Sequence, residues 1–160
     1  SPSLSLPLPA PPSASQVVLH RNLNSKNLLV DEGGKVKVSD FGWSCCKVDM
    51  GKTFHVSWEW VAPEVLGGGH FSEKADVYSF AMVTWEVLTQ TKPFHDMNPM
   101  QMGFAVGAQK YRPPLPDDCP KPLGRLIEAC WHDQPAQRPS FASVLDRLQA
   151  LQALAEFGKG

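Results

Sequence analysis

The sequence predicts a mainly α-helical fold with one small β-hairpin, and three observations lead to this prediction. Residues 72–90 are apolar on nearly every helical face, which is typical of a helix buried in a core. Two later stretches, residues 122–131 and 141–157, carry apolar residues at helical spacing. Residues 28–38 contain two short β-prone runs separated by a pair of glycines, which is the pattern of a hairpin.

The chain divides into a short tail and one domain. Residues 1–16 are rich in proline and serine, and their five prolines fix φ and remove backbone donors. We therefore expect a disordered segment there. The 160 residues are enough for one domain, which we place at residues 17–157.

Composition excludes several classes of protein. With 42% hydrophobic residues and a formal net charge of −1, the chain can form a globular core and lacks the basic surface of a nucleic-acid-binding protein. No apolar run approaches membrane-spanning length. The four cysteines show no C-x-x-C spacing, so we expect no metal or disulfide framework and a reducing, cytoplasmic location.

The hairpin is the first predicted element after the tail. Gly33 and Gly34 can supply the positive φ that its turn needs. A hairpin brings its two flanks together, so Asn22 and Asn27 before it can face Asp40 after it. A carboxylate and carboxamides gathered in this way are oxygen ligands suited to a hard divalent cation, although the same residues are also common turn formers.

The helices follow in order, each with a start signal. Ser72 is the expected N-cap of the helix over residues 72–90, and Asp76 in its first turn is then a buried or half-buried acid that needs donors. Asn98 and Pro99 are expected to start a short helix that ends near Gln109. Ser140 should cap the last helix, whose predicted inward residues are Phe141, Val144, Leu145, Leu148, Leu151 and Leu154.

Two motifs in the first half resemble the protein kinase family. The run His20-Arg21-Asn22-Leu23-Asn24-Ser25-Lys26-Asn27 looks like the catalytic loop H-R-D-L-x-x-x-N, and Asp40-Phe41-Gly42 looks like the metal-binding D-F-G. Both occur in the family's order and at its usual separation. The resemblance covers residues 17–150 and corresponds to the helical C-terminal lobe of a kinase domain, without the N-terminal lobe. It is strongest to the tyrosine-kinase-like group, which includes the Raf-like serine/threonine kinases.

The resemblance implies roles for the residues around the hairpin. Asn27 and Asp40 would bind magnesium and, through it, ATP. Asn22 occupies the position of the catalytic base, where the family has aspartate. Lys26 lies four positions after Asn22, as does an arginine in many tyrosine kinases, whereas Asn24 replaces the lysine usual in serine/threonine kinases. Substrate type therefore leans to serine and threonine without being settled.

Further residues are assigned by the same resemblance. His20 and Arg21 have structural roles in the loop, and Asp76 would hold its backbone. Residues 43–61 would form the activation segment, in which Thr53 is either a phosphorylation site or a plain loop residue and Ser57 would help to position substrate. Glu64 of the A-P-E-like run Ala62-Pro63-Glu64 is predicted to form an ion pair with Arg138.

The sequence leaves two hypotheses about function. In the first hypothesis, the chain is part of a serine/threonine-type protein kinase domain whose family role is to phosphorylate protein hydroxyls. The isolated chain would be inactive because of Asn22 and the missing lobe. The alternative is a pseudokinase or lobe fragment that acts as a binding or scaffold module. The expected partners are a protein substrate or signalling protein, with a further partner possible over the surface that would face an N-terminal lobe.

Overall fold

A computed structural model describes residues 17–46 and 57–157 of the chain, so the predicted disordered segment at residues 1–16 lies outside the described residues. The elements run in the order β1 (Val18–Leu19), β2 (Leu28–Val30), β3 (Val36–Val38), β4 (Cys45–Cys46), α1 (Pro63–Leu66), α2 (Glu73–Thr89), α3 (Pro99–Gly107), α4 (Lys121–Cys130) and α5 (Phe141–Phe157). Short 3-10 helices cover Ser25–Asn27, Phe41–Trp43, Trp58–Trp60 and Pro135–Gln137. The predicted mainly α-helical fold with a small hairpin is confirmed.

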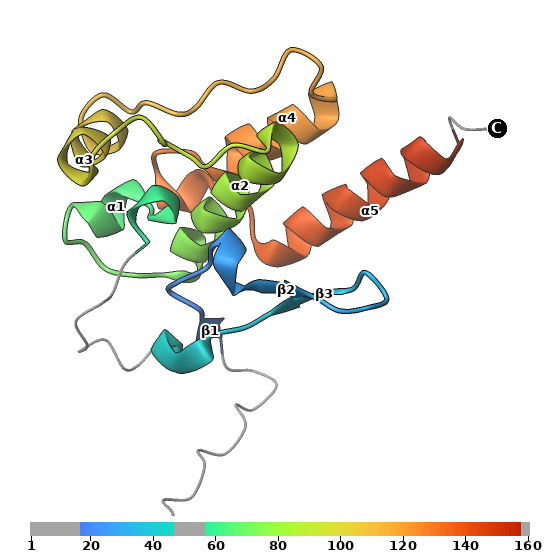
Figure 1. Cartoon of the computed structure of the whole chain (residues 1–160), viewed down its shortest axis with the longest axis horizontal. Coiled ribbons are helices and arrows are strands. Elements are labelled where there is room, and N and C mark those ends of the chain that lie inside the picture. Colours follow the sequence, from blue (N-terminus) through green and yellow to red (C-terminus); the bar gives the residue numbers. More distant parts are fainter. Residues whose placement is uncertain (1–16, 47–56, 158–160) are drawn as a thin grey trace, which may run out of the picture.

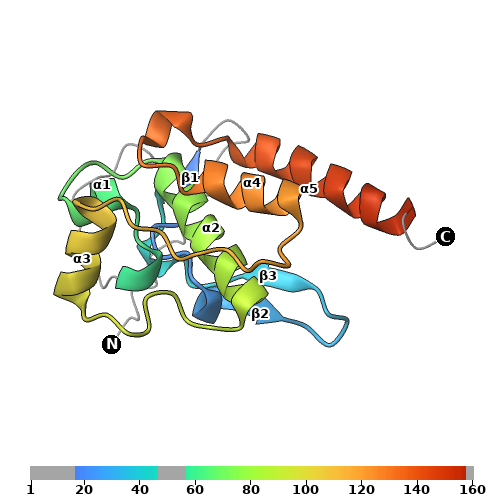
Figure 2. The same ribbon diagram turned by 90° about the horizontal axis from the view of Figure 1, so that it is seen from above.

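Helix α2 is the centre of the molecule. The other helices and the hairpin are arranged around it, and α4 packs against both α2 and α5 (Figures 1 and 2). Ser72 caps α2 by accepting the Lys74 backbone N–H, as predicted. Its side chains Tyr78 and Met82 are fully buried, together with Trp60 before α1 and Ile127 on α4. Strand β1 and the 3-10 helix Trp58–Trp60 therefore pack against a helix that follows them in sequence.

The predicted hairpin is formed by β2 and β3, which pair antiparallel with Leu28 opposite Val38 and Val30 opposite Val36. Gly34 has a positive φ of 78°, but Gly33 does not. The expectation that both glycines adopt positive φ is therefore wrong for Gly33, because the Asp31 carboxylate accepts the backbone N–H groups of residues 33 and 35 and closes the turn. A second antiparallel pair joins β1 to β4, and local sequence does not predict it.

The short helix α3 begins as predicted. Asn98 accepts two backbone N–H groups of the first turn, and the Gln101 side chain accepts the Asn98 backbone N–H, so the two residues form a capping box. Pro99 occupies the first helical position, where its missing N–H is not needed. The helix ends at Gly107, two residues before the predicted end.

Helix α5 starts at the predicted residue, but its predicted inward face is only partly correct. Val144 is buried, whereas Phe141, Leu145 and Leu154 are exposed by 41%, 55% and 65%. The C-terminal half of α5 extends past α4 (Figures 1 and 2), which explains the exposure at that end of the helix. At the start of α5, Phe141 contacts Phe80 of α2 edge-to-face and is otherwise open to solvent. The helical pattern therefore identifies the apolar stripe correctly, but no described element covers much of it.

The buried thiol of Cys130 provides a test of the core. Burial raises the pKa of Cys130 to about 11. At pH 8 its thiolate fraction should be roughly 100-fold lower than that of an ordinary thiol, so we expect iodoacetamide to leave Cys130 unmodified in the native chain and to modify the half-buried Cys119. Peptide mass spectrometry measures both sites, and in guanidinium chloride both should react.

The same shift has a consequence for stability at alkaline pH. The pKa of Cys130 in the fold lies above its value in the unfolded chain, so the unfolded state releases the proton first. The contribution of this thiol to stability is therefore complete below pH 9 and is lost as the pH rises toward 11. Equal alkylation of Cys119 and Cys130 in the native chain would contradict the buried position.

Candidate functional site

Asp76 on α2 anchors the loop that carries the candidate site. Its carboxylate accepts the backbone N–H of His20 at 2.7 Å and that of Arg21 at 3.0 Å. Burial raises the pKa of Asp76, and these two N–H groups oppose the rise. Arg21 has a φ of 68°, which is uncommon for a residue other than glycine, and the two hydrogen bonds hold the loop in that conformation.

His20 connects this loop to the segment after the hairpin. Its Nδ1 accepts the backbone N–H of Asn22 at 3.3 Å, which leaves Nε2–H as the donor to the Ser39 carbonyl oxygen at 2.9 Å. The imidazole also packs edge-to-face on Phe41, with ring centroids 5.0 Å apart. The two loops are therefore fixed to each other through one side chain.

The predicted meeting of Asn22, Asn27 and Asp40 is present. The Asp40 Oδ2 atom accepts an amide N–H from Asn22 at 3.3 Å and another from Asn27 at 3.4 Å. Asn27 also donates to the Asn22 carbonyl oxygen at 2.8 Å, which ties the two ends of the loop together. Asp40 is exposed and has a positive φ of 62°, so its carboxylate stands at the surface with one oxygen engaged by amides.

Asn24 organises this cluster, and the sequence alone did not identify that role. Only 2% of its surface is exposed, and its Nδ2 group donates to the main-chain and side-chain oxygens of Asn22 at 2.8 and 3.1 Å. The same group lies 3.4 Å from Ser57 Oγ. Ser57 is thereby placed beside the loop that carries Asn22.

Glu86 on α2 is a second residue that sequence reasoning missed. Its Oε1 accepts the Ser25 hydroxyl and its Oε2 accepts the Trp60 indole N–H, both at 3.0 Å. Ser25 belongs to the candidate loop and Trp60 to the segment before α1. One carboxylate therefore sets the distance between the two parts of the chain that border the site.

A pair of substitutions tests this connection. Glu86→Ala leaves the buried Trp60 N–H without its acceptor, and we expect the free energy of unfolding to fall by about 1–3 kcal/mol. Glu86→Gln should cost much less, because its amide oxygen can accept from Trp60 while its amide group donates to the Ser25 hydroxyl. Urea denaturation followed by circular dichroism measures both. Equal losses in the two variants would contradict this hydrogen-bonding role.

The remaining predicted residues occupy different positions. Lys26 is exposed on the 3-10 helix of the loop, and the Arg21 guanidinium lies 5.9 Å from the centre of the Phe71 ring. Thr53 lies outside the described residues. Among the described residues, no three histidine, cysteine, aspartate or glutamate side chains gather as metal ligands, so Asp40 would need amide or phosphate oxygens beside it to hold a cation.

The predicted ion pair between Glu64 and Arg138 is present and bidentate. Both guanidinium nitrogens lie 2.8 Å from the Glu64 carboxylate oxygens, and Arg138 is 1% exposed. The Arg138 guanidinium also lies 5.1 Å from the centre of the ring of Tyr78, a fully buried residue of α2. The pair therefore joins the segment after Trp60 to the turn before α5.

Comparison with known proteins agrees with this geometry. The family model described as protein tyrosine and serine/threonine kinase matches residues 14–148. The chain belongs to the protein kinase family. It is 42% identical over 84% of its length to serine/threonine/tyrosine-protein kinase HT1 of Arabidopsis thaliana. It is 44% identical over 84% of its length to probable serine/threonine-protein kinase drkC, and 41% identical over 87% to dual specificity protein kinase shkA, both of Dictyostelium discoideum.

This kinase-family chain spans only part of each relative. It corresponds to 35% of the length of HT1, 19% of drkC and 28% of shkA. The match to a model that includes tyrosine and serine/threonine kinases agrees with the resemblance to the tyrosine-kinase-like group. No helix in the described part of the chain is long and apolar enough to cross a membrane.

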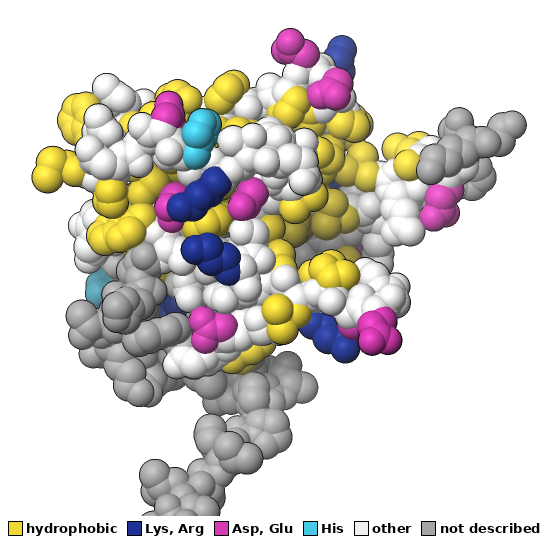
Figure 3. Space-filling model, in the orientation of Figure 1, with side chains coloured by type: hydrophobic (Ala, Val, Ile, Leu, Met, Phe, Trp, Pro, Cys, Tyr) yellow, Lys and Arg dark blue, Asp and Glu magenta, His cyan; other side chains and the backbone are white. Residues whose placement is uncertain are grey.

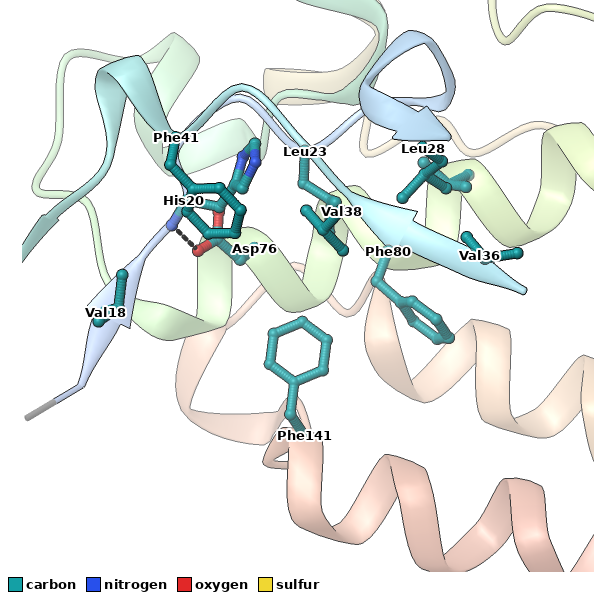
Figure 4. Close-up of a pocket in the computed structure, with 11 residues that line it drawn as sticks. Val18, His20, Leu23, Leu28, Val36, Val38, Phe41, Asp76, Phe80 and Phe141 are labelled. Carbon is teal, nitrogen blue, oxygen red and sulfur yellow. Dashed lines mark hydrogen bonds between the residues drawn. The ribbon is translucent and has the colours of Figure 1, made fainter. Parts of the chain in front are cut away.

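An apolar pocket lies beside the kinase motifs. It has a volume of about 430 Å³ and is open at the surface between the hairpin, α2 and the start of α5. Figure 4 shows Val36 and Val38 on one side, Phe80 and Phe141 on another, and Phe41 near its end. Figure 3 shows hydrophobic side chains exposed along the hairpin, where Val30 and Val36 are more than half exposed.

Proposed function

We propose that the chain is the C-terminal part of a protein kinase domain whose role is the transfer of phosphate from ATP to serine or threonine hydroxyls of proteins. The observation that supports this most is the contact of Asn22 and Asn27 with Asp40, built on a loop that Asp76 holds by two backbone hydrogen bonds. The motif residues thus meet although 13 to 56 positions separate them.

The donor set of the site fits magnesium with a nucleotide. Asp40 supplies one carboxylate and Asn27 one carboxamide, and magnesium in such sites takes one or two carboxylates together with phosphate oxygens. We propose that these two residues hold the ion, which would neutralise charge on the transferred phosphate. The Asp40 Oδ1 atom has no hydrogen bond or ion pair with any described residue, so it is open to a ligand.

The substrate hydroxyl would bind near Asn22. The Asn22 Oδ1 atom can accept a hydrogen bond and so orient the hydroxyl, but a carboxamide cannot take up its proton. Ser57, held near the same loop by Asn24, would help to position the substrate. We therefore propose that this chain binds and orients a protein hydroxyl and gives weak or no proton-acceptor assistance.

The test compares the chain alone with the chain joined to the N-terminal kinase lobe of a relative such as HT1. The joined protein should transfer labelled phosphate from magnesium-ATP to protein serine or threonine, and the chain alone should not. Asp40→Asn in the joined protein should abolish transfer, and the exposed Asp117→Asn is the matched control, which should retain it. A folded joined protein that neither binds magnesium-ATP nor transfers phosphate would refute the proposal.

One observation favours the alternative, a binding module without phosphate transfer. The pocket beside Phe41 is lined mainly by apolar side chains and lies open at the surface, so it fits an apolar segment of a partner protein. Asn22 at the base position is consistent with this alternative as well. A joined protein that binds a signalling partner but transfers no phosphate would favour it over the enzyme.

A further inference from the structure

A second groove runs along the opposite end of the helical layer, away from the kinase motifs. It lies between α4 and the C-terminal half of α5 and has a volume of about 360 Å³. Helix α5 contributes Arg147, Ala150, Leu151 and Leu154, which are spaced as one helical face. Helix α4 contributes Arg125 and Leu126, so each wall carries one arginine and at least one leucine.

The leucines give the groove an apolar floor that is open to solvent. Leu126 is buried at its base, Leu151 is half-buried, and Leu154 is 65% exposed. Leu154 lies in the last turn of α5, and the C-terminal end of this helix extends past α4 in Figure 2. The floor therefore follows the axis of α5 and ends on a side chain that is mostly exposed.

The two arginines place positive charge on both walls of the groove. Within residues 17–46 and 57–157, neither Arg125 nor Arg147 forms a hydrogen bond or an ion pair. The acidic residues nearest to them in sequence, Glu128 and Asp146, form no ion pair with them either. Other exposed basic residues on this chain do have partners, such as Lys92 with Glu59 and Lys110 with Asp133.

We propose that this groove binds an amphipathic helix of a partner protein, with leucine-type residues on one stripe and acidic residues on both sides of it. A third helix can pack into the groove between two helices and bury the leucines. Acidic side chains on its flanks would then reach Arg125 on one wall and Arg147 on the other, and guanidinium groups bind carboxylates in a bidentate manner. The occupant is assigned by the charge and shape of the groove and does not depend on phosphate transfer.

The test uses a labelled synthetic helical peptide with a leucine stripe flanked by glutamates, and fluorescence anisotropy with the full chain. Arg125→Glu combined with Arg147→Glu should weaken binding by at least about tenfold. Leu154→Ala should also weaken it, whereas Lys35→Glu and Leu29→Ala, exposed on the hairpin, are the matched controls and should not. Because the substituted side chains are exposed, circular dichroism should show an unchanged fold.

Two further measurements make the outcome decisive. Binding of the peptide to the unaltered chain should weaken as salt rises, and a peptide with lysine in place of glutamate should bind at least about tenfold more weakly. The proposal would be overturned if the two peptides bound equally well, or if the double arginine variant bound the glutamate peptide as tightly as the unaltered chain does. Tight binding of the fatty acid dodecanoate at the arginines, in place of the peptide, would also overturn it. A dimer of this chain that the same variants dissociate would show instead that a second copy occupies the groove.

Discussion

Replacing Arg138 with alanine should lower the free energy of unfolding by about 3–5 kcal/mol, because it leaves the Glu64 carboxylate without its partner in a largely buried position. Each of the five N–H hydrogens of Arg138 has an acceptor. The acceptors are the two carboxylate oxygens of Glu64 and the backbone oxygens of Lys74, His132 and Asp133. No smaller side chain can replace these contacts.

Urea denaturation followed by circular dichroism at 25 °C measures the loss. The matched control is Arg125→Ala, which removes an exposed guanidinium that has no ion pair with any described residue and should change stability by no more than about 0.5 kcal/mol. Glu64→Gln should destabilise less than Arg138→Ala, since an amide oxygen can still accept from the guanidinium. A loss below about 1 kcal/mol for Arg138→Ala would show that the pair is not important for the fold.

Replacing Asn22 with aspartate in the joined protein should raise the rate of phosphate transfer by about 10²–10⁴. This prediction rests on the proposed function. An aspartate at this position can orient the substrate hydroxyl and also accept its proton, whereas the carboxamide can only orient it. Rates with saturating magnesium-ATP and a protein substrate measure the gain.

The same substitution should make the stability of the site depend on a divalent cation. In the present chain an amide N–H of Asn22 contacts Asp40 Oδ2 at 3.3 Å, and aspartate would place a second carboxylate against the first. We expect Asn22→Asp to unfold at lower temperature without magnesium and to regain stability with it. Asn98→Asp, at a helix cap where aspartate is equally suitable, is the matched control and should alter neither rate nor magnesium dependence. An unchanged rate in Asn22→Asp would show that proton acceptance there does not limit the reaction.

The parts of the fold that local sequence predicts are those in which a few neighbouring residues determine the geometry. Ser72 and Asn98 cap their helices because each side chain satisfies N–H groups only two or three residues away. The turn at Gly34 has the same local origin. The meeting of Asn27 with Asp40 was predictable because a hairpin of known length separates them.

The parts that sequence did not predict depend on distant segments. The apolar stripe of α5 shows in its spacing, but the spacing does not reveal that Leu145 and Leu154 stay more than half exposed in the fold. Glu86 follows an ordinary helical pattern, and only the fold brings Ser25 and Trp60 to its two oxygens. The pairing of β1 with β4 involves only two residues of each strand, which is too few to produce a recognisable strand pattern in the sequence.

The contact between Glu64 and Arg138 can form only after both residues have been synthesised. The two residues are 74 positions apart, and ribosomes add roughly 5–20 residues per second, so roughly 4–15 s separate their synthesis. For part of this interval α2 has been translated while α4, against which it packs, has not. We therefore expect the nascent chain to need chaperone protection until Arg138 has emerged, and slow codons between these positions to lower the yield of folded protein.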